Sequence, residues 1–152
     1  MEIRSITQAD IPALKAVLDT IELFPSAMLD QMIADYLVNP DTQEIWFTAI
    51  QDDLPISIGY CAPEQMTLGT YNLYAIGVRD DLQGKGIGSK MMTYLEEDLR
   101  KKNQRILIVD TSGTDDFAQT RHFYKKLNYQ QEAVIRDFWN EGDDKVVFRK
   151  RL

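Results

Sequence analysis

The chain has 152 residues, of which 44% are apolar and 27% are charged, the balance of a folded soluble domain rather than a disordered or membrane protein. This length is enough for one domain with its own core, so we expect residues 1–152 to form a single domain. The net charge of −7 opposes binding to nucleic acid or anionic membrane. No apolar run approaches the roughly 20 residues of a membrane-spanning helix, and no basic segment followed by an apolar one opens the chain, which predicts a cytoplasmic protein.

Hydrophobic spacing predicts the elements of the first half of the chain. In order, we expect a strand at 2–6, a helix over 11–21 capped by Thr7 or Asp10, a second helix between Pro25 and the "NPD" at 39–41, a hairpin of strands 44–50 and 56–62, and a long apolar strand at 70–78.

The second half begins with an amphipathic helix from residue 87 to about 101, in which apolar residues recur at every fourth position. A buried strand at 105–111, a helix at 115–127 with Asn128 at its C-terminal cap, and two strands at 132–139 and 145–152 joined by "NEGDD" complete the order. This pattern predicts a mixed α/β domain.

Three glycines in "QGKGIGS", residues 83–89, stand directly before a good helix. The first turn of a helix offers unpaired N–H groups, and glycines let an anion come close to them, so we expect phosphate binding here. The spacing excludes a P-loop, because the order is Gly-Ser-Lys. A dinucleotide-binding turn fits poorly, since Ser89 replaces its third glycine, but it stays an alternative with Asp110 as the ribose-binding acid.

The segment "YAIGVRDDLQGKGIG" resembles the acyl-CoA-binding motif of the GNAT acetyltransferase superfamily, and "HFYKKLNY" resembles its second signature. The resemblance covers essentially the whole chain. It implies a GNAT-like fold: a mixed, mostly antiparallel central sheet that splays between two parallel strands and is flanked by helices.

The resemblance also implies acetyl-CoA as the acetyl donor and CoA as the product. The main chain of Ile76, Gly77 and Val78 would pair with the pantetheine arm. The pyrophosphate would lie against the loop residues, which are Gln83, Gly84, Lys85, Gly86, Ile87, Gly88 and Ser89.

For catalysis, Tyr124 matches the family's general acid and would contact the CoA sulfur, either by giving it a proton or by a hydrogen bond. Asn72 stands where many relatives carry a catalytic glutamate, and an amide can orient a water or the substrate but cannot accept the proton. Asp110 is then a candidate base or amine binder, with Glu64 and Asp137 as alternatives.

Other positions depart from the family pattern or define the substrate cleft. Phe117 replaces a common cofactor-contacting asparagine, a contact that Thr111, Ser112 or Thr114 could supply instead. We expect Cys61 in the core, His122 facing solvent and no metal site. The acceptor would meet residues of the first two helices and the last hairpin, including Glu22, Phe24, Trp139 and Glu141, while "IRDFW" (135–139) is a candidate homodimer contact.

The sequence therefore predicts an N-acetyltransferase that moves the acetyl group of acetyl-CoA directly to a primary amine of a small molecule or peptide. Two alternatives stay open: a non-catalytic CoA-binding sensor or regulatory module on the same fold, supported by Asn72, and the dinucleotide-binding domain.

Overall fold

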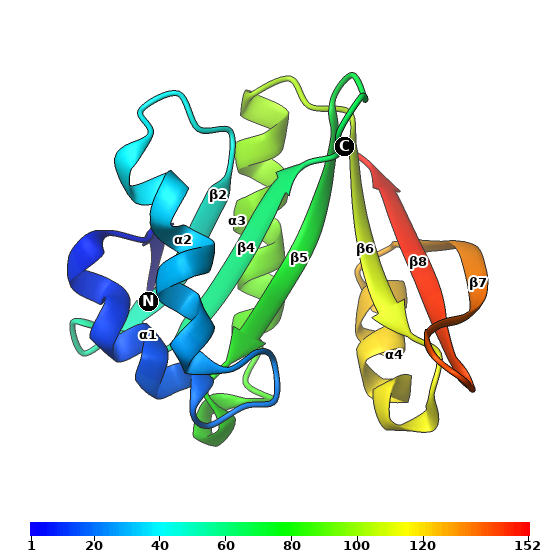
Figure 1. The fold of residues 1–152 in the computed structure, drawn as a ribbon, viewed down its shortest axis with the longest axis horizontal. Helices are drawn as coiled ribbons and strands as arrows, with labels where there is room; N and C mark the ends of the chain where they lie inside the picture. The colour runs from blue at the N-terminus through cyan, green and yellow to red at the C-terminus, as the bar shows by residue number, and fades with distance from the viewer. The chain divides into compact units, whose positions relative to one another are not determined.

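A computed structural model describes residues 1–152 (Figure 1). Its helices are α1 (Ile11–Leu18), α2 (Leu29–Val38), α3 (Ile87–Lys101) and α4 (Ala118–Lys126). Its strands are β1 (Glu2–Ser5), β2 (Ile45–Gln51), β3 (Leu54–Pro55), β4 (Ser57–Pro63), β5 (Thr70–Val78), β6 (Ile106–Ser112), β7 (Gln130–Asn140) and β8 (Asp143–Arg151). The eight strands follow the order β1-β2-β4-β5-β6-β8-β7, with β3 beside β2.

The chain divides into two compact units. The first unit comprises Met1–Ala62 and Tyr74–Asp98, and the second comprises Pro63–Leu73 and Leu99–Leu152. Strand β5 begins in the second unit and ends in the first, so it contributes residues to both.

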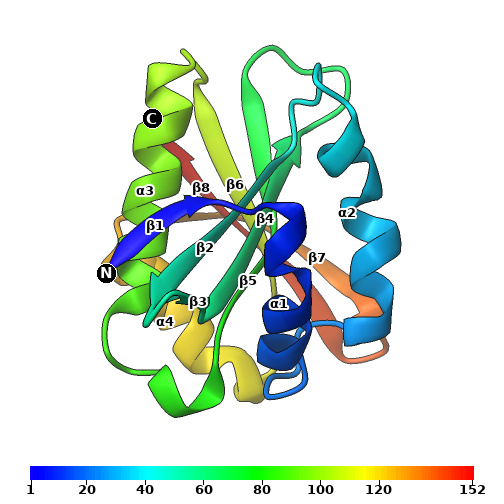
Figure 2. The same ribbon diagram turned by 90° about the vertical axis from the view of Figure 1, so that its left-hand side faces the viewer.

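Helices cover both faces of the strands in the first unit, as Figure 2 shows. Trp46 and Phe47 are consecutive in β2 and fully buried, so their side chains point to opposite faces. Trp46 packs in a cluster with apolar residues of α1 and α2, whereas the Phe47 ring stacks on Tyr94 of α3 with centroids 5.7 Å apart. Because side chains alternate between the two faces of β2, one face of the strand packs against α1 and α2 and the other packs against α3.

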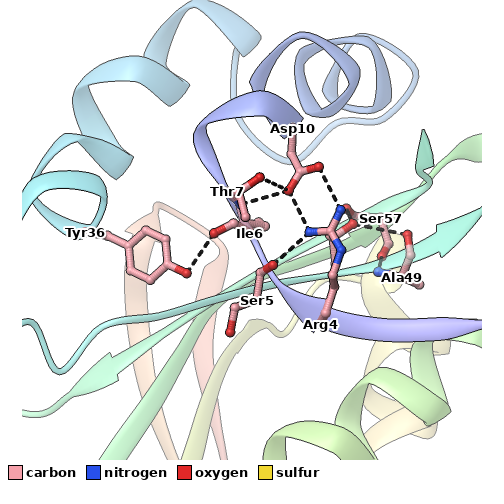
Figure 3. A network of polar contacts seen from close by, with 9 residues as sticks. Arg4, Ser5, Ile6, Thr7, Asp10, Tyr36, Ala49 and Ser57 are labelled. Atoms are coloured by element: carbon pink, nitrogen blue, oxygen red, sulfur yellow. Dashed lines mark hydrogen bonds and ion pairs between the residues drawn. The ribbon is translucent and has the colours of Figure 1, made fainter. Parts of the chain in front are cut away.

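A polar network joins β1 to the turn before α1 (Figure 3). Arg4 donates two hydrogen bonds to the carboxylate of Asp10, at 2.8 and 3.0 Å, and the Thr7 backbone N–H donates a third at 2.8 Å. Tyr36 of α2 donates to the Ile6 carbonyl at 2.9 Å. Hydrogen bonding from Arg4 lowers the pKa of Asp10, although its burial acts in the opposite direction.

The second unit is built on mixed strand pairing. Thr70–Leu73 of β5 pair in parallel with Ile106–Val109 of β6, β6 pairs antiparallel with β8, and β8 pairs antiparallel with β7. Together with the antiparallel β1, β2 and β4, this confirms the expected α/β class with a mixed, mostly antiparallel sheet and flanking helices.

Most expected elements occur, with shifts at their ends. Helix α1 ends at Leu18 rather than at residue 21, because the Thr20 hydroxyl and backbone N–H both donate to the Val17 carbonyl in a turn. The expected hairpin turns through Asp52 and Asp53, both with positive φ, and the two-residue strand β3 follows it. None of the helices combines the length with the apolar composition that a membrane-spanning helix needs.

Candidate active site

The glycine loop follows the end of β5 in the first unit. Val78 is the last residue of β5, and a single helical turn at Asp80–Leu82 leads to Gln83. The side-chain amide of Gln83 donates to the Val78 carbonyl at 3.0 Å, while the Arg79 N–H donates to the Ile56 carbonyl at 2.9 Å. The entry to the loop is therefore fixed to β5 and to the segment before β4.

Gly84 and Gly86 both have positive φ, at 75° and 81°, a conformation that residues with a Cβ rarely adopt. A Cβ built on either glycine meets no atom within 4 Å, so the space beside the loop is open. Helix α3 starts at Ile87, and its first hydrogen bond runs from the Lys90 N–H to the Gly86 carbonyl at 3.2 Å. An open glycine cradle at the N-terminus of a 15-residue helix fits a phosphate group.

The expected cofactor residues at the end of β5 and in the loop lie in the same unit, whereas Tyr124 belongs to the second unit. Ile76, Gly77 and Val78 are half-buried at the end of β5, and Lys85 is exposed. A Cβ on Gly77 would lie 2.5 Å from the Ile21 Cδ1 atom, so Gly77 also allows the segment after α1 to pack closely.

Tyr124 lies on α4 in the second unit, with 2% of its surface exposed. Its ring packs against the rings of Phe123, Tyr129 and Phe148, at centroid distances of 5.1 to 5.8 Å. Burial raises the pKa of Tyr124 above its usual value, so the phenol stays protonated at neutral pH.

A cluster of polar side chains surrounds Asn72 in the second unit. The Asn72 Nδ2 group donates to Glu64 Oε1 at 2.7 Å and to Asp110 Oδ2 at 3.2 Å. Asn72 is 2% exposed, and its Oδ1 atom has no hydrogen-bond partner. The structure thus brings Asn72 and Asp110 into direct contact and adds Glu64 to them.

Lys145 of β8 completes the cluster, and sequence reasoning missed it. Its Nζ atom lies 3.3 Å from Asp110 Oδ2 and 4.3 Å from the centre of the Phe138 ring. Trp139 beside Phe138 donates from Nε1 to the Thr111 carbonyl at 3.2 Å. Only the register of β8 on β6 indicates that Lys145 lies near Asp110. This register places Lys145 opposite Ser112, two residues beyond Asp110.

Several other candidate site residues make hydrogen bonds within the protein. The Thr111 hydroxyl donates to the Val146 carbonyl, and the Ser112 hydroxyl donates to Asp143 and also contacts Thr114. Asp137 accepts the Gly142 N–H at 2.9 Å and so stabilises the last hairpin.

Of the remaining residues discussed from the sequence, some are buried and others are exposed to solvent. Cys61 is buried, as expected, and His122 is exposed, as expected. Phe117 is also exposed, as are Glu22, Trp139 and Glu141, whereas Phe24 packs against the core under α1 and α2.

Comparison with known proteins places this architecture in a family. The model of the acetyltransferase (GNAT) domain matches residues 42–131, which is more than half of the chain. No curated protein sequence matches it.

Solved structures are similar over nearly the full length. A GNAT-family acetyltransferase from Desulfovibrio desulfuricans is 26% identical with a TM-score of 0.91, covering 99% of this chain and 98% of its own. A ribosomal-protein-alanine N-acetyltransferase from Brucella melitensis is 19% identical with a TM-score of 0.80, covering 100% of both chains. An aminoglycoside 6'-N-acetyltransferase complexed with coenzyme A is 17% identical with a TM-score of 0.78, covering 99% of this chain and 97% of its own.

The match of the family model over the glycine loop and Tyr124, together with the shared fold, shows that this chain belongs to the GNAT acetyltransferase family.

Proposed function

We propose that the protein is an N-acetyltransferase that moves the acetyl group of acetyl-CoA to a primary amine of a small molecule or peptide, with residues 1–152 acting as one domain. The observation that carries this proposal is the open glycine loop before α3 in a chain of the GNAT family. Family members use acetyl-CoA, and the amines named for similar structures include protein and aminoglycoside groups.

The loop would bind the cofactor through its backbone. The N–H groups between Gln83 and Ser89 would donate to the pyrophosphate, where the helix dipole favours negative charge. The main chain of Ile76, Gly77 and Val78 would pair with the pantetheine arm, and Lys85 would add positive charge. Positive φ at Gly84 and Gly86 supports this assignment, because it turns the loop without placing a side chain in the open space.

Tyr124 would stabilise the leaving thiolate of CoA. An ordinary thiol has a pKa of about 8.5, well below the raised pKa of Tyr124, so complete proton transfer from the phenol to the thiolate is uphill. The neutral hydroxyl is therefore suited to donate a hydrogen bond to the sulfur while the proton comes from solvent. The raised pKa of Tyr124 therefore supports the hydrogen-bonding role over the proton-donating one.

Asn72 and Asp110 would serve the amine side of the reaction. Asp110 pairs with the ammonium group of Lys145. An amine substrate carries the same positively charged group before it loses a proton. Asn72 would orient the neighbouring carboxylates, consistent with its two hydrogen bonds.

Calorimetric titration with acetyl-CoA tests the cofactor assignment, with NAD and ATP as controls. We expect binding of acetyl-CoA at one site per chain and no binding of NAD or ATP. Absence of acetyl-CoA binding would overturn the proposed function.

A non-catalytic CoA-binding module is the second candidate, and the amide at position 72 in place of a carboxylate favours it. The two candidates differ in one measurement. A sensor would bind acetyl-CoA but release no CoA thiol with any amine.

A further inference from the structure

Three aromatic rings form a row across strands β2, β4 and β5, which are neighbours in the sheet (Figure 1). Trp46 of β2 is the register partner of Tyr60 of β4, and their rings stack with centroids 4.1 Å apart and an angle of 13° between the planes. Tyr60 in turn packs on Tyr74 of β5, with centroids 5.5 Å apart and an angle of 30°. The three side chains, all in the first unit, therefore lie on one face of these strands.

The row runs from the core to the solvent. Trp46 is fully buried in the cluster with α1 and α2, and its Nε1 donates to Glu44 at 2.9 Å, which fixes the inner ring. Tyr60 is half-buried against the same cluster. Tyr74 is 51% exposed and is the one exposed residue of β5. The parallel pairing of β5 with β6 ends at Leu73, so the row ends at a ring that a ligand can reach.

Tyr74 also lies on the side of the cofactor where the acetyl group would be. In the proposed arrangement, the pyrophosphate lies at the loop after Val78, and the pantetheine arm runs back along β5 from Val78 to Ile76. The thioester is at the opposite end of this arm from the pyrophosphate, so it would lie beyond Ile76, toward Tyr74. A strand rises about 3.3 Å per residue, which puts Tyr74 about 7 Å from Ile76 along β5. An amine that reaches the thioester would therefore lie near Tyr74.

A held ring at this place favours an aromatic ligand. Aromatic rings prefer offset-stacked or edge-to-face partners, and such a pair adds about two- to tenfold to an affinity beyond the effect of the area that it buries. Tyr60 and Trp46 support the Tyr74 ring from behind, so little side-chain freedom remains to be lost when a ligand binds. An aliphatic ligand of the same size would bury similar area without the ring contact.

We propose that Tyr74 is a specificity-determining residue of the acceptor site and that the preferred acceptor is an arylalkylamine, a primary amine with an aromatic ring a few bonds from its nitrogen. This inference rests on the proposed function and narrows its substrate class. The ring of the acceptor stacks on Tyr74 as the fourth ring of the row, and its amine points along β5 toward Ile76. Tyr74 binds and orients the acceptor and takes no part in proton transfer.

The first test measures kcat/KM for 2-phenylethylamine and 2-cyclohexylethylamine, which share a carbon skeleton and differ in aromaticity. We expect the ratio of the two values to be about fivefold larger in the wild type than in Tyr74→Leu, which keeps an apolar side chain but removes the ring. The two amines differ in basicity, but this difference cancels when the ratio is compared between proteins.

Two further variants show whether the ring itself is responsible. Tyr74→Phe should keep the wild-type ratio, because the ring remains and only the hydroxyl with its contacts is lost. Leu54→Ala is the matched control, since Leu54 is also an apolar strand residue of the first unit and is 57% exposed. L54A should also keep the wild-type ratio.

A second test needs no turnover. The wild-type protein with labelled tyrosine rings is titrated with 2-phenylethylammonium chloride while NMR follows the Tyr74 signals, which are assigned by their loss in Y74L. CoA is present in place of acetyl-CoA, so that no acetyl group is transferred. We expect the ring current of the aromatic amine to shift these signals, and 2-cyclohexylethylammonium chloride at the same concentration to shift them less than half as far.

The outcomes separate this inference from the proposed function. The inference is wrong, while the acetyltransferase assignment stands, if the protein acetylates amines but the ratio is the same in wild type and Y74L. The same holds if it acetylates other amines but not 2-phenylethylamine, or if 2-phenylethylammonium leaves the Tyr74 signals unchanged. If these signals shift but acetyl-CoA does not bind in the calorimetric titration, the aromatic amine site stands and the proposed function is wrong.

Discussion

Gln83 ties the glycine loop to the strand before it: its side-chain Nε2 donates to the Val78 carbonyl at 3.0 Å. Four residues separate the two partners in the chain, and three of them form the helical turn Asp80–Leu82. The hydrogen bond therefore holds the loop at the point where it leaves β5.

Replacing Gln83 by Ala should weaken acetyl-CoA binding about fivefold, because one hydrogen bond contributes about 1 kcal/mol to the loop conformation. Gln51→Ala, at the exposed end of β2, is the control. Calorimetry measures both dissociation constants, and equal values would show that the Gln83 bond does not organise the loop.

Gly86→Glu should abolish acetyl-CoA binding, because a carboxylate would enter the open space where the phosphates are expected. Normal binding by Gly142→Glu would show that an added carboxylate and a strained turn elsewhere in the chain do not by themselves cause the loss. Gly142 is the matched control, since it also has positive φ, at 78°, and open space for a Cβ. Normal acetyl-CoA binding by G86E would contradict the assignment of the loop.

Tyr124→Phe should lower kcat about 10- to 100-fold and leave the dissociation constant of acetyl-CoA nearly unchanged, since only the hydroxyl at the sulfur is lost. Tyr36→Phe is the control, because it removes the hydrogen bond to the Ile6 carbonyl, far along the chain in the other unit. Y36F should reduce stability by about 1 kcal/mol without changing kcat. Full turnover by Y124F would exclude the hydroxyl from the reaction.

Asp10→Asn should lower the free energy of unfolding by about 2 kcal/mol at pH 7, because it leaves the Arg4 guanidinium without its charged partner. The exposed pair between Lys15 and Asp30 provides the control, and Asp30→Asn should cost less than 1 kcal/mol. Urea unfolding measures both. A similar loss in the two variants would mean that burial adds nothing to the Asp10 network.

The same network predicts a pH dependence. The pKa of Asp10 is lowered in the folded protein, so its contribution is complete above the unfolded value of about 3.9 and is lost as the pH falls through the folded value. The stability difference between wild type and D10N should be constant above about pH 5 and shrink at lower pH. A difference that stays constant down to pH 3 would contradict the assigned shift.

Elements with strong local signals were predictable from the sequence. The stripe of apolar residues in α3, the glycines before it and the apolar strand β6 all carry their information within a few residues, and the structure has them at the expected places. Asn128 adopts the positive φ expected of a helix C-terminal cap. End positions were less accurate where a turn competes with the helix, as Thr20 does after α1.

The polar cluster was only partly predictable. Asn72 and Asp110 were candidates for separate reasons, but they are 38 positions apart in the sequence and nothing local shows that they touch. The contact with Glu64 requires the turn that pairs its N–H with the Thr70 carbonyl, and the contact with Lys145 requires the register of β8 on β6. Such contacts depend on long-range pairing, which hydrophobic periodicity does not specify.

The most direct test of the central claim is release of CoA thiol from acetyl-CoA by the purified protein, measured with and without a panel of primary amines. The account predicts amine-dependent release with formation of the matching N-acetyl product, reduced at least tenfold in Tyr124→Phe. Tight acetyl-CoA binding with no thiol release across small-molecule and peptide amines would contradict it and favour the CoA-binding sensor.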